Sequence, residues 1–95
     1  MRFGIFSQTP GYEGSSVARR HWETVEEDVL GEERSFKTAW RAESVFYPTR
    51  PMSNPLMVAI AAAQKTERIR FGTLAAQAPL HHHFHMATQA ATCDI

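Results

Sequence analysis

The sequence predicts an α/β fold built from three strand–helix units whose strands run parallel. Short apolar segments rich in β-prone residues occur around Ile5, Ala39 and Phe71, and each precedes a segment with helical periodicity or a helix start signal. Such alternation implies parallel strands joined by right-handed crossovers. A parallel sheet needs cover on both faces, and its edges need protection. We therefore do not expect three units with open edges to form a complete domain.

The first strand is expected at residues 3–7 and the first helix at residues 17–34. The loop between them contains two glycines, a proline and two candidate helix N-caps. One face of the helix carries apolar residues spaced by four, three and four positions, namely Ala18, Trp22, Val25 and Val29. We expect this face to pack on the sheet, with Trp22 in the core, and the charged remainder to face solvent.

The second strand is expected at residues 36–40 and is followed by a long loop at residues 42–54. Loops of this length are often functional. Asn54 and Pro55 form a helix start signal, because Asn caps free amides and Pro fits the first helical position. The helix that follows, residues 56–64, is apolar nearly all round. We therefore expect it to lie wedged between neighbouring elements.

The third strand is expected at residues 69–74, and a loop of small residues closed by Pro79 follows it. Gly72 marks a place where another group approaches the backbone. A third helix is predicted at residues 84–93. Its inner face is expected to carry Phe84, Ala87 and Ala91. A strand that ends in such a loop just before a helix is where α/β proteins place ligand sites.

Composition is that of an ordinary globular chain, with 43% hydrophobic and 21% charged residues. Lys+Arg and Asp+Glu both number 10, so no overall field attracts nucleic acid or a membrane surface. The lone Cys93 excludes an internal disulfide and gives no reason to expect an oxidising compartment. The longest uncharged apolar run, residues 55–63, is far shorter than the ~20 residues of a membrane span. We expect a soluble cytoplasmic protein that binds neither nucleic acid nor membranes.

Length limits how much of a barrel the chain can form. A complete (β/α)8 barrel takes roughly 250 residues, and this chain has 95. It ends at Ile95, inside or just beyond the third expected helix, without a C-cap or a polar tail. We therefore expect residues 1–95 to be an N-terminal fragment of a partial TIM (β/α)8 barrel, comprising its first three βα units.

Short blocks in a fixed order give the chain a family resemblance. They are residues 1–6 (MRFGIF), 36–43 (FKTAWRAE), 54–55 (NP), 66–73 (TERIRFGT) and 79–82 (PLHH). With these blocks the whole chain resembles the N-terminal part of the bacterial-luciferase-like, flavin-dependent monooxygenase family. Each block alone is weakly specific. Together, their order and spacing indicate the superfamily and leave the substrate open.

The resemblance implies a TIM barrel whose C-terminal face holds reduced FMN, or in some relatives the deazaflavin F420. It implies that Phe6 and the backbone of Thr73, Leu74 and Ala75 line the flavin pocket. It also implies a cis peptide bond between Leu74 and Ala75. The reaction would use O2 and a small organic substrate, with a flavin reductase as a partner, and the full-length form would be a homo-oligomer. The isolated chain is expected to be inactive, because barrel phosphate sites commonly come from the loops after strands seven and eight.

The same resemblance makes Glu43 and Ser44 the candidate catalytic residues. Glu43 would hydrogen-bond near the ring or the substrate, and Ser44 would position oxygen or substrate. Many relatives carry Glu-His-His-Phe where this chain has Glu-Ser-Val-Phe at residues 43–46. A serine hydroxyl does not act as a base near pH 7 without help, whereas histidine titrates in that range. The alternative is a purely structural role, in which Phe6 and Leu74 fill a layer of the barrel interior and Glu43 pairs with a lysine or arginine.

Two other features have alternative interpretations. The run His81–His85 suggests a metal site, but no Cys or carboxylate lies close by in the sequence, so solvated or capping histidines and no metal are expected. Trp40 is expected in the core, with ligand stacking as the alternative. Two further functions stay open: an F420-dependent oxidoreductase of the same superfamily, and a non-catalytic metal- or partner-binding module that uses the histidine run.

Overall fold

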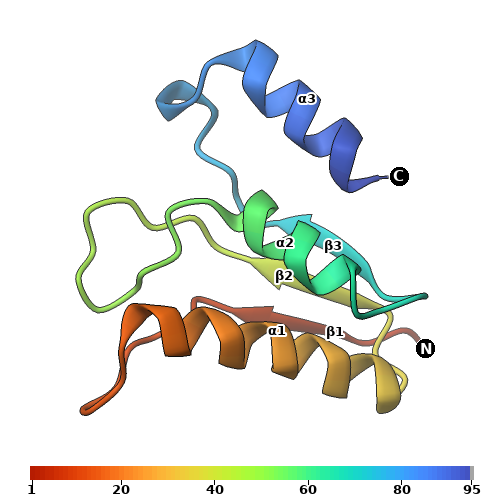
Figure 1. Cartoon of the computed structure of the whole chain (residues 1–95). Coiled ribbons are helices and arrows are strands. Elements are labelled where there is room, and N and C mark those ends of the chain that lie inside the picture. Colours follow the sequence, from red (N-terminus) through yellow and green to blue (C-terminus); the bar gives the residue numbers. More distant parts are fainter. Residues whose placement is uncertain (95) are drawn as a thin grey trace.

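The computed structural model of the chain describes residues 1–94 and shows strands alternating with helices (Figure 1). In chain order the elements are β1 (Gly4–Ser7), α1 (Val17–Glu33), β2 (Thr38–Arg41), α2 (Pro55–Ala63), β3 (Arg70–Thr73), the short 3-10 helix η1 (Ala78–Leu80) and α3 (His83–Cys93). The strands form one sheet in the order β1-β2-β3, and both pairs are parallel. The predicted α/β fold with three parallel βα units is confirmed.

The three strands end at the same level. Ser7, Arg41 and Thr73 are neighbours in the two ladders. The pairing continues beyond them, because the N–H of Ala42 donates to the carbonyl of Ser7 (3.3 Å) and the N–H of Leu74 donates to that of Arg41 (2.8 Å). We call this edge of the sheet the rim. It comprises residues 6–7, 41–44 and 73–77.

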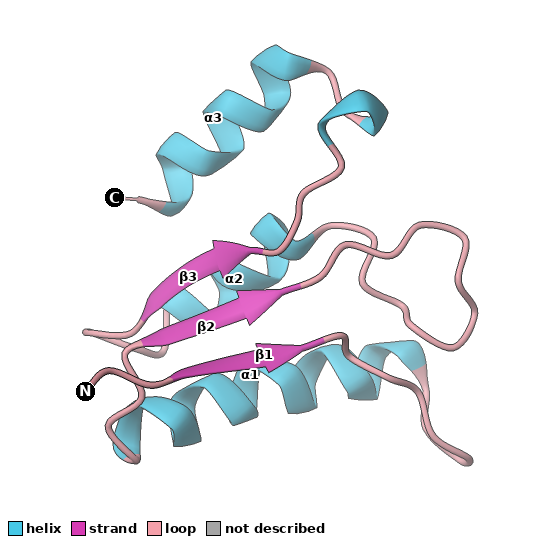
Figure 2. Ribbon diagram, turned by 180° about the vertical axis from the view of Figure 1, so that it is seen from behind, coloured by secondary structure: helices cyan, strands magenta, loops and turns pink. Residues whose placement is uncertain are grey.

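Helices α1 and α2 cover one face of the sheet, and Figure 2 shows the sheet from its other side. Helix α1 approaches the sheet closely at Gly31, where a Cβ would collide with the side chain of Ile5 in β1. The buried apolar residues are Val25, Ala39, Met52, Ala59, Ala62 and Ile69. The core therefore lies between the sheet and these two helices.

Within residues 1–94, no helix covers the opposite face of the sheet (Figure 2). On this face the indole of Trp40 lies over Gly72, where a Cβ would come within 2.5 Å of the ring. The indole Nε1 donates to the hydroxyl of Thr38 (3.1 Å). Trp40 is 39% exposed, and Phe6 beside it is 50% exposed. The expectation of a core role for Trp40 is therefore wrong for the described chain, and ligand stacking stays a prediction.

Helix α1 begins as expected but packs differently. The hydroxyl of Ser16 caps it by accepting from the N–H of Arg19 (3.1 Å). Trp22, expected in the core, is 60% exposed, and Ala18 is exposed as well. The residues that α1 buries are Arg20, Thr24, Val25, Asp28 and Gly31. The expected face is confirmed at Val25, which is buried, and at Val29, which is half-buried, but is wrong at Ala18 and Trp22, because buried polar contacts to the strand ends turn that part of the helix away from the sheet.

Strands β2 and β3 begin later than expected, at Thr38 and Arg70. The N–H of Phe36 donates to the carbonyl of Gly31 (2.9 Å) and so closes the end of α1. The N–H of Ile69 donates to the carboxylate of Glu32 (2.7 Å). The backbone N–H groups of Phe36 and Ile69 therefore bond outside the sheet, and the hydrogen-bonded parts of β2 and β3 are shorter than expected.

Helix α2 starts where the sequence predicts. The side chain of Asn54 accepts from the N–H of Met57 (3.2 Å), and Pro55 occupies the first turn. The helix packs between α1 and α3, as the wedged position requires, but Met57 remains exposed on its outer side. Within residues 1–94, no helix is long and apolar enough to cross a membrane.

Helix α3 packs beside α2 and stands away from the sheet (Figure 1). Its expected inner face is wrong, because Phe84 is 62% exposed and Ala87 and Ala91 are exposed too. The half-buried side chains of α3 are those of Met86, Gln89 and Cys93. An open groove lined by residues of α2, β3 and α3 separates α3 from the edge of β3.

Candidate functional site

The structure brings all the proposed site residues to the rim. They come from three separate stretches of the chain: Phe6, Glu43, Ser44, Thr73, Leu74 and Ala75. Because the strands are parallel and in register, their carboxyl ends meet at this edge. Barrel and open-sheet α/β proteins place their chemistry at the same edge.

The segment after β3 offers backbone and small side chains to solvent. The peptide bond between Leu74 and Ala75 is cis, as the resemblance implies. Leu74 is 59% exposed, Ala75 is exposed, and Ala76 is half-buried. The small side chains of Ala75 and Ala76 leave this stretch of backbone accessible to a flat ligand.

Glu43 is buried at the rim and both of its carboxylate oxygens are occupied. Oε2 accepts from the N–H of Gln77 (2.8 Å), and Oε1 lies 2.6 Å from Nε2 of His81. The side-chain amide of Gln77 donates back to the Glu43 carbonyl (3.2 Å). Glu43 thus fastens the turn at residues 77–81 onto the end of β2. The alternative pairing with a lysine or arginine is wrong, because the partner is a histidine.

His81 is the site residue that sequence reasoning missed. The sequence predicts a solvated or capping histidine, yet the side chain of His81 is only 24% exposed and pairs with Glu43. The two residues are 38 positions apart in the chain. Only the level ends of β2 and β3 bring them together, and residue spacing alone does not reveal such a pair.

Ser44 closes the long loop between β2 and α2. Its N–H donates to the carbonyl of Met52 (2.7 Å), and the side chain of Met52 is fully buried. The loop is thereby pinched into a neck at Ser44 and Met52. Beyond the neck, Phe46 and Tyr47 are exposed. Ser44 itself is buried on the rim beside Glu43.

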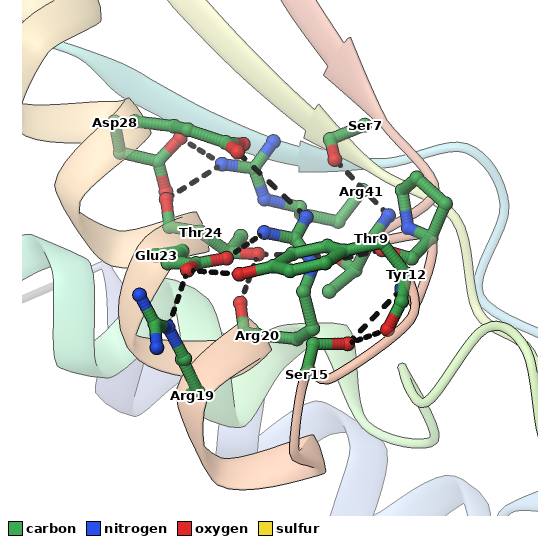
Figure 3. A network of polar contacts seen from close by, with 12 residues as sticks. Ser7, Thr9, Tyr12, Ser15, Arg19, Arg20, Glu23, Thr24, Asp28 and Arg41 are labelled. Carbon is green, nitrogen blue, oxygen red and sulfur yellow. Dashed lines mark hydrogen bonds and ion pairs between the residues drawn. The ribbon is translucent and has the colours of Figure 1, made fainter.

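Below the rim, buried polar side chains tie α1 to the ends of β1 and β2 (Figure 3). Arg41 forms an ion pair with Asp28, and both side chains are buried. Burial raises the pKa of Asp28, and the Arg41 charge opposes that rise. Asp28 Oδ2 and Arg41 Nε have no hydrogen-bond partner within the described residues. The pair holds the end of β2, two residues before Glu43, against α1.

A second polar group holds the loop between β1 and α1 (Figure 3). The hydroxyl of Tyr12 donates to Glu23 (2.6 Å), and Nε of Arg19 donates to the same oxygen (3.0 Å). Nε of Arg20 donates to the carbonyl of Pro10 (2.7 Å). The hydrogen bond from Tyr12, followed by that from Arg20, lowers the pKa of Glu23 to about 2. The loop that borders Phe6 is thereby fixed to α1.

The remaining histidines of the run lie at the start of α3. His82 caps this helix, because its Nδ1 accepts from the N–H of Phe84 (3.2 Å). The rings of His82 and His83 stack with their centroids 4.6 Å apart. Among residues 1–94, no group of three His, Cys, Asp or Glu side chains is arranged to hold a metal ion.

Three parallel βα units with a polar site at the strand ends are the arrangement expected for part of a (β/α)8 barrel. The family model for luciferase-like monooxygenases matches residues 1–95, so the chain belongs to that family. A search of curated proteins finds no match.

Solved structures share the fold. One is the oxygenating constituent of 3,6-diketocamphane monooxygenase from the CAM plasmid of Pseudomonas putida, a type II Baeyer-Villiger monooxygenase in complex with FMN. It is 21% identical, has a TM-score of 0.87, and aligns with 94% of this chain and 24% of its own length. Monooxygenase RslO1 from Streptomyces bottropensis is 28% identical over 99% of this chain and 29% of its own, with a TM-score of 0.87. Apo-MsnO8 is 20% identical over 93% of this chain and 27% of its own, with a TM-score of 0.86. The chain thus spans about a quarter of the length of these structures.

Proposed function

We propose that this chain is the N-terminal part of a flavin-dependent monooxygenase whose flavin ring lies against the Leu74–Ala75 backbone. One observation carries the proposal: Phe6, Glu43 and the exposed Leu74–Ala75 segment meet at the rim of a luciferase-like chain. The FMN complex of the 3,6-diketocamphane monooxygenase constituent supports a flavin-type cofactor. FMN is the cofactor we propose, with F420 as the alternative.

The residues of the rim fit a flat apolar ring. Leu74 and Phe6 offer exposed apolar side chains, and Ala75 lets the ring approach the backbone. Thr73 would complete the floor beneath the ring. When bound, the reduced flavin would react with O2. The protein would orient the flavin and the substrate and exclude water from them.

Two polar residues at the rim, Glu43 and Ser44, have separate roles in the proposed site. Glu43 fixes the turn that follows the flavin floor, through its bonds to Gln77 and His81. Ser44 would orient the small organic substrate or O2 with its hydroxyl. A flavin reductase as partner, a homo-oligomeric full-length form and a cytoplasmic location remain predictions.

A chimera tests the flavin floor. Residues 1–94 replace the matching segment of the oxygenating constituent of 3,6-diketocamphane monooxygenase, and FMN binding is followed by fluorescence titration. We expect the chimera to bind FMN and Ala75→Trp to weaken binding at least about tenfold, or ~1.4 kcal/mol, because the indole occupies the place of the ring. Ala18→Trp, at an exposed position on α1 away from the rim, is the matched control. Equal affinities for both variants would contradict the proposal.

The isolated chain provides the complementary measurement. We expect it to show no tight FMN binding, because the loops that commonly hold the phosphate of barrel ligands follow strands seven and eight. A submicromolar dissociation constant for the 95-residue chain would show that the phosphate site is not needed.

A further inference from the structure

A histidine of the turn after β3 is in direct contact with a buried carboxylate of the rim. His81 Nε2 lies 2.6 Å from Glu43 Oε1, and the Glu43 side chain is fully buried. An ionised carboxylate has no hydrogen to give and only accepts hydrogen bonds. With Glu43 in its ionised form, the proton between the two side chains sits on Nε2. In a neutral imidazole that proton leaves Nδ1 as an unprotonated acceptor.

We propose that Glu43 is a positioning residue that holds neutral His81 in the Nε2–H form, so that Nδ1 is the proton acceptor of the site. When Nδ1 takes a proton from an O–H or N–H group of a bound ligand, the ligand keeps the electron pair. The ring becomes an imidazolium, and the Glu43 carboxylate stabilises its charge. The inference rests on the proposed function only for the identity of that ligand.

The other polar groups of the rim do not offer this chemistry. Ser44 offers only a hydroxyl, which is a poor base near pH 7. Both oxygens of Glu43 are engaged, one by the N–H of Gln77 and one by His81. A titratable ring thus reaches the rim from the turn after β3 rather than from the end of β2.

Two other histidines provide internal standards for the position of the ring proton. Nδ1 of His21 lies 2.9 Å from the carbonyl of Val17, so Nδ1 must donate and the ring is in the Nδ1–H form. Nδ1 of His82 accepts from the N–H of Phe84, so that ring is in the Nε2–H form. The chain therefore contains one standard for each form.

The test is a two-bond proton–nitrogen correlation spectrum of the ¹⁵N-labelled chain at about pH 8.5, some two units above the ordinary pKa of histidine. His81→Gln identifies the His81 signals by their loss. We expect the His81 ring to carry one proton, on Nε2, with slow exchange of that proton with water. A ring that is still doubly protonated at this pH would overturn the proposal, because it would have no acceptor nitrogen.

Glu43→Gln tests whether Glu43 sets the position of the His81 ring proton or only tethers the turn at residues 77–81. The new amide has one oxygen, which the N–H of Gln77 requires, so its NH2 group faces His81 Nε2 and forces that atom to accept. We expect the His81 ring to switch to the Nδ1–H form, while Glu43→Ala leaves its Nε2 proton in fast exchange. Glu26→Gln, an exposed carboxylate on α1, is the matched control and should change nothing.

The two proposals fail separately. Unchanged His81 spectra in Glu43→Gln, with His21 and His82 keeping their forms, would overturn the positioning role. A chimera that binds no FMN would overturn the flavin proposal and would leave the ring-proton result standing.

Discussion

At the scale of single residues, the buried pair of Asp28 and Arg41 is the most consequential contact beneath the site. Both side chains lie out of water, and one polar atom on each has no partner within the described residues. The desolvation of two charges costs several kcal/mol per ion and is offset only by good geometry and full hydrogen bonding. We therefore expect the pair to fix the position of α1 against β2 rather than to add large net stability.

Breaking this pair from one side is expected to be costly. Asp28→Ala leaves the Arg41 charge buried without its partner and should lower the free energy of unfolding by about 3–5 kcal/mol. Asp28→Leu combined with Arg41→Met removes both charges and should cost much less. Urea denaturation measures both changes. A double variant that is less stable than Asp28→Ala would contradict this account.

At the scale of elements, Glu32 at the end of α1 joins the helix to the start of β3. Its carboxylate accepts from three successive backbone N–H groups, those of Glu67, Arg68 and Ile69. The hydrogen bonds from Arg68 and Ile69 are the main cause that lowers the pKa of Glu32 from its usual 4.5. A side chain thus sets the point at which β3 begins.

This contact predicts a pH dependence with a definite sign. Because the pKa of Glu32 is lower in the folded chain, its stabilisation is complete above 4.5 and is lost as the pH falls through the lowered value. The difference in unfolding free energy between the native chain and Glu32→Gln should therefore shrink on acidification from about pH 6 to about pH 2.5. Glu33→Gln, its exposed neighbour, should show no such trend. A constant difference for Glu32→Gln would be the contrary result.

Local signals in the sequence predicted most elements well. Ser16 and Asn54 act as the expected caps, and the order of strands and helices follows from the alternation of patterns. The rotation of α1 was not predictable from apolar spacing, because Arg20, Thr24 and Asp28 are buried instead of Trp22. Polar residues normally mark the solvent side of a helix, and only their distant partners reveal the exception.

The candidate site likewise has a part that the sequence predicts and a part that it does not. Its position at the strand ends follows from parallel topology and from the family resemblance. The contact between Glu43 and His81 depends on which strand lies beside which and at what level. The spacing of residues along one segment does not reveal which strands are neighbours or at what level they end.

At the scale of the whole molecule, one face of the sheet is open within the described residues (Figure 2). Phe6 and Trp40 lie side by side on that face, and both are partly exposed. Exposed apolar surface of this kind favours association. In a complete barrel, the same face would point to the interior.

This arrangement predicts self-association of the isolated chain. Phe6→Ser combined with Trp40→Ser should lower the association measured by sedimentation velocity, because it removes the aromatic surface from the open face. Leu80→Ser with Phe84→Ser is the matched control, since these side chains are similarly exposed but lie on η1 and α3. If the two pairs of substitutions have equal effects, the open face is not the surface that associates.

The neck formed by Ser44 and Met52 has a consequence for the loop beyond it. Since the backbone bond across it and the buried Met52 side chain anchor the loop at its base, the tip at residues 45–51 can be lengthened, shortened or rewritten without moving Glu43 or the cap at Asn54. Changes in the length or sequence of this tip should therefore leave the contacts of Glu43 with Gln77 and His81 intact.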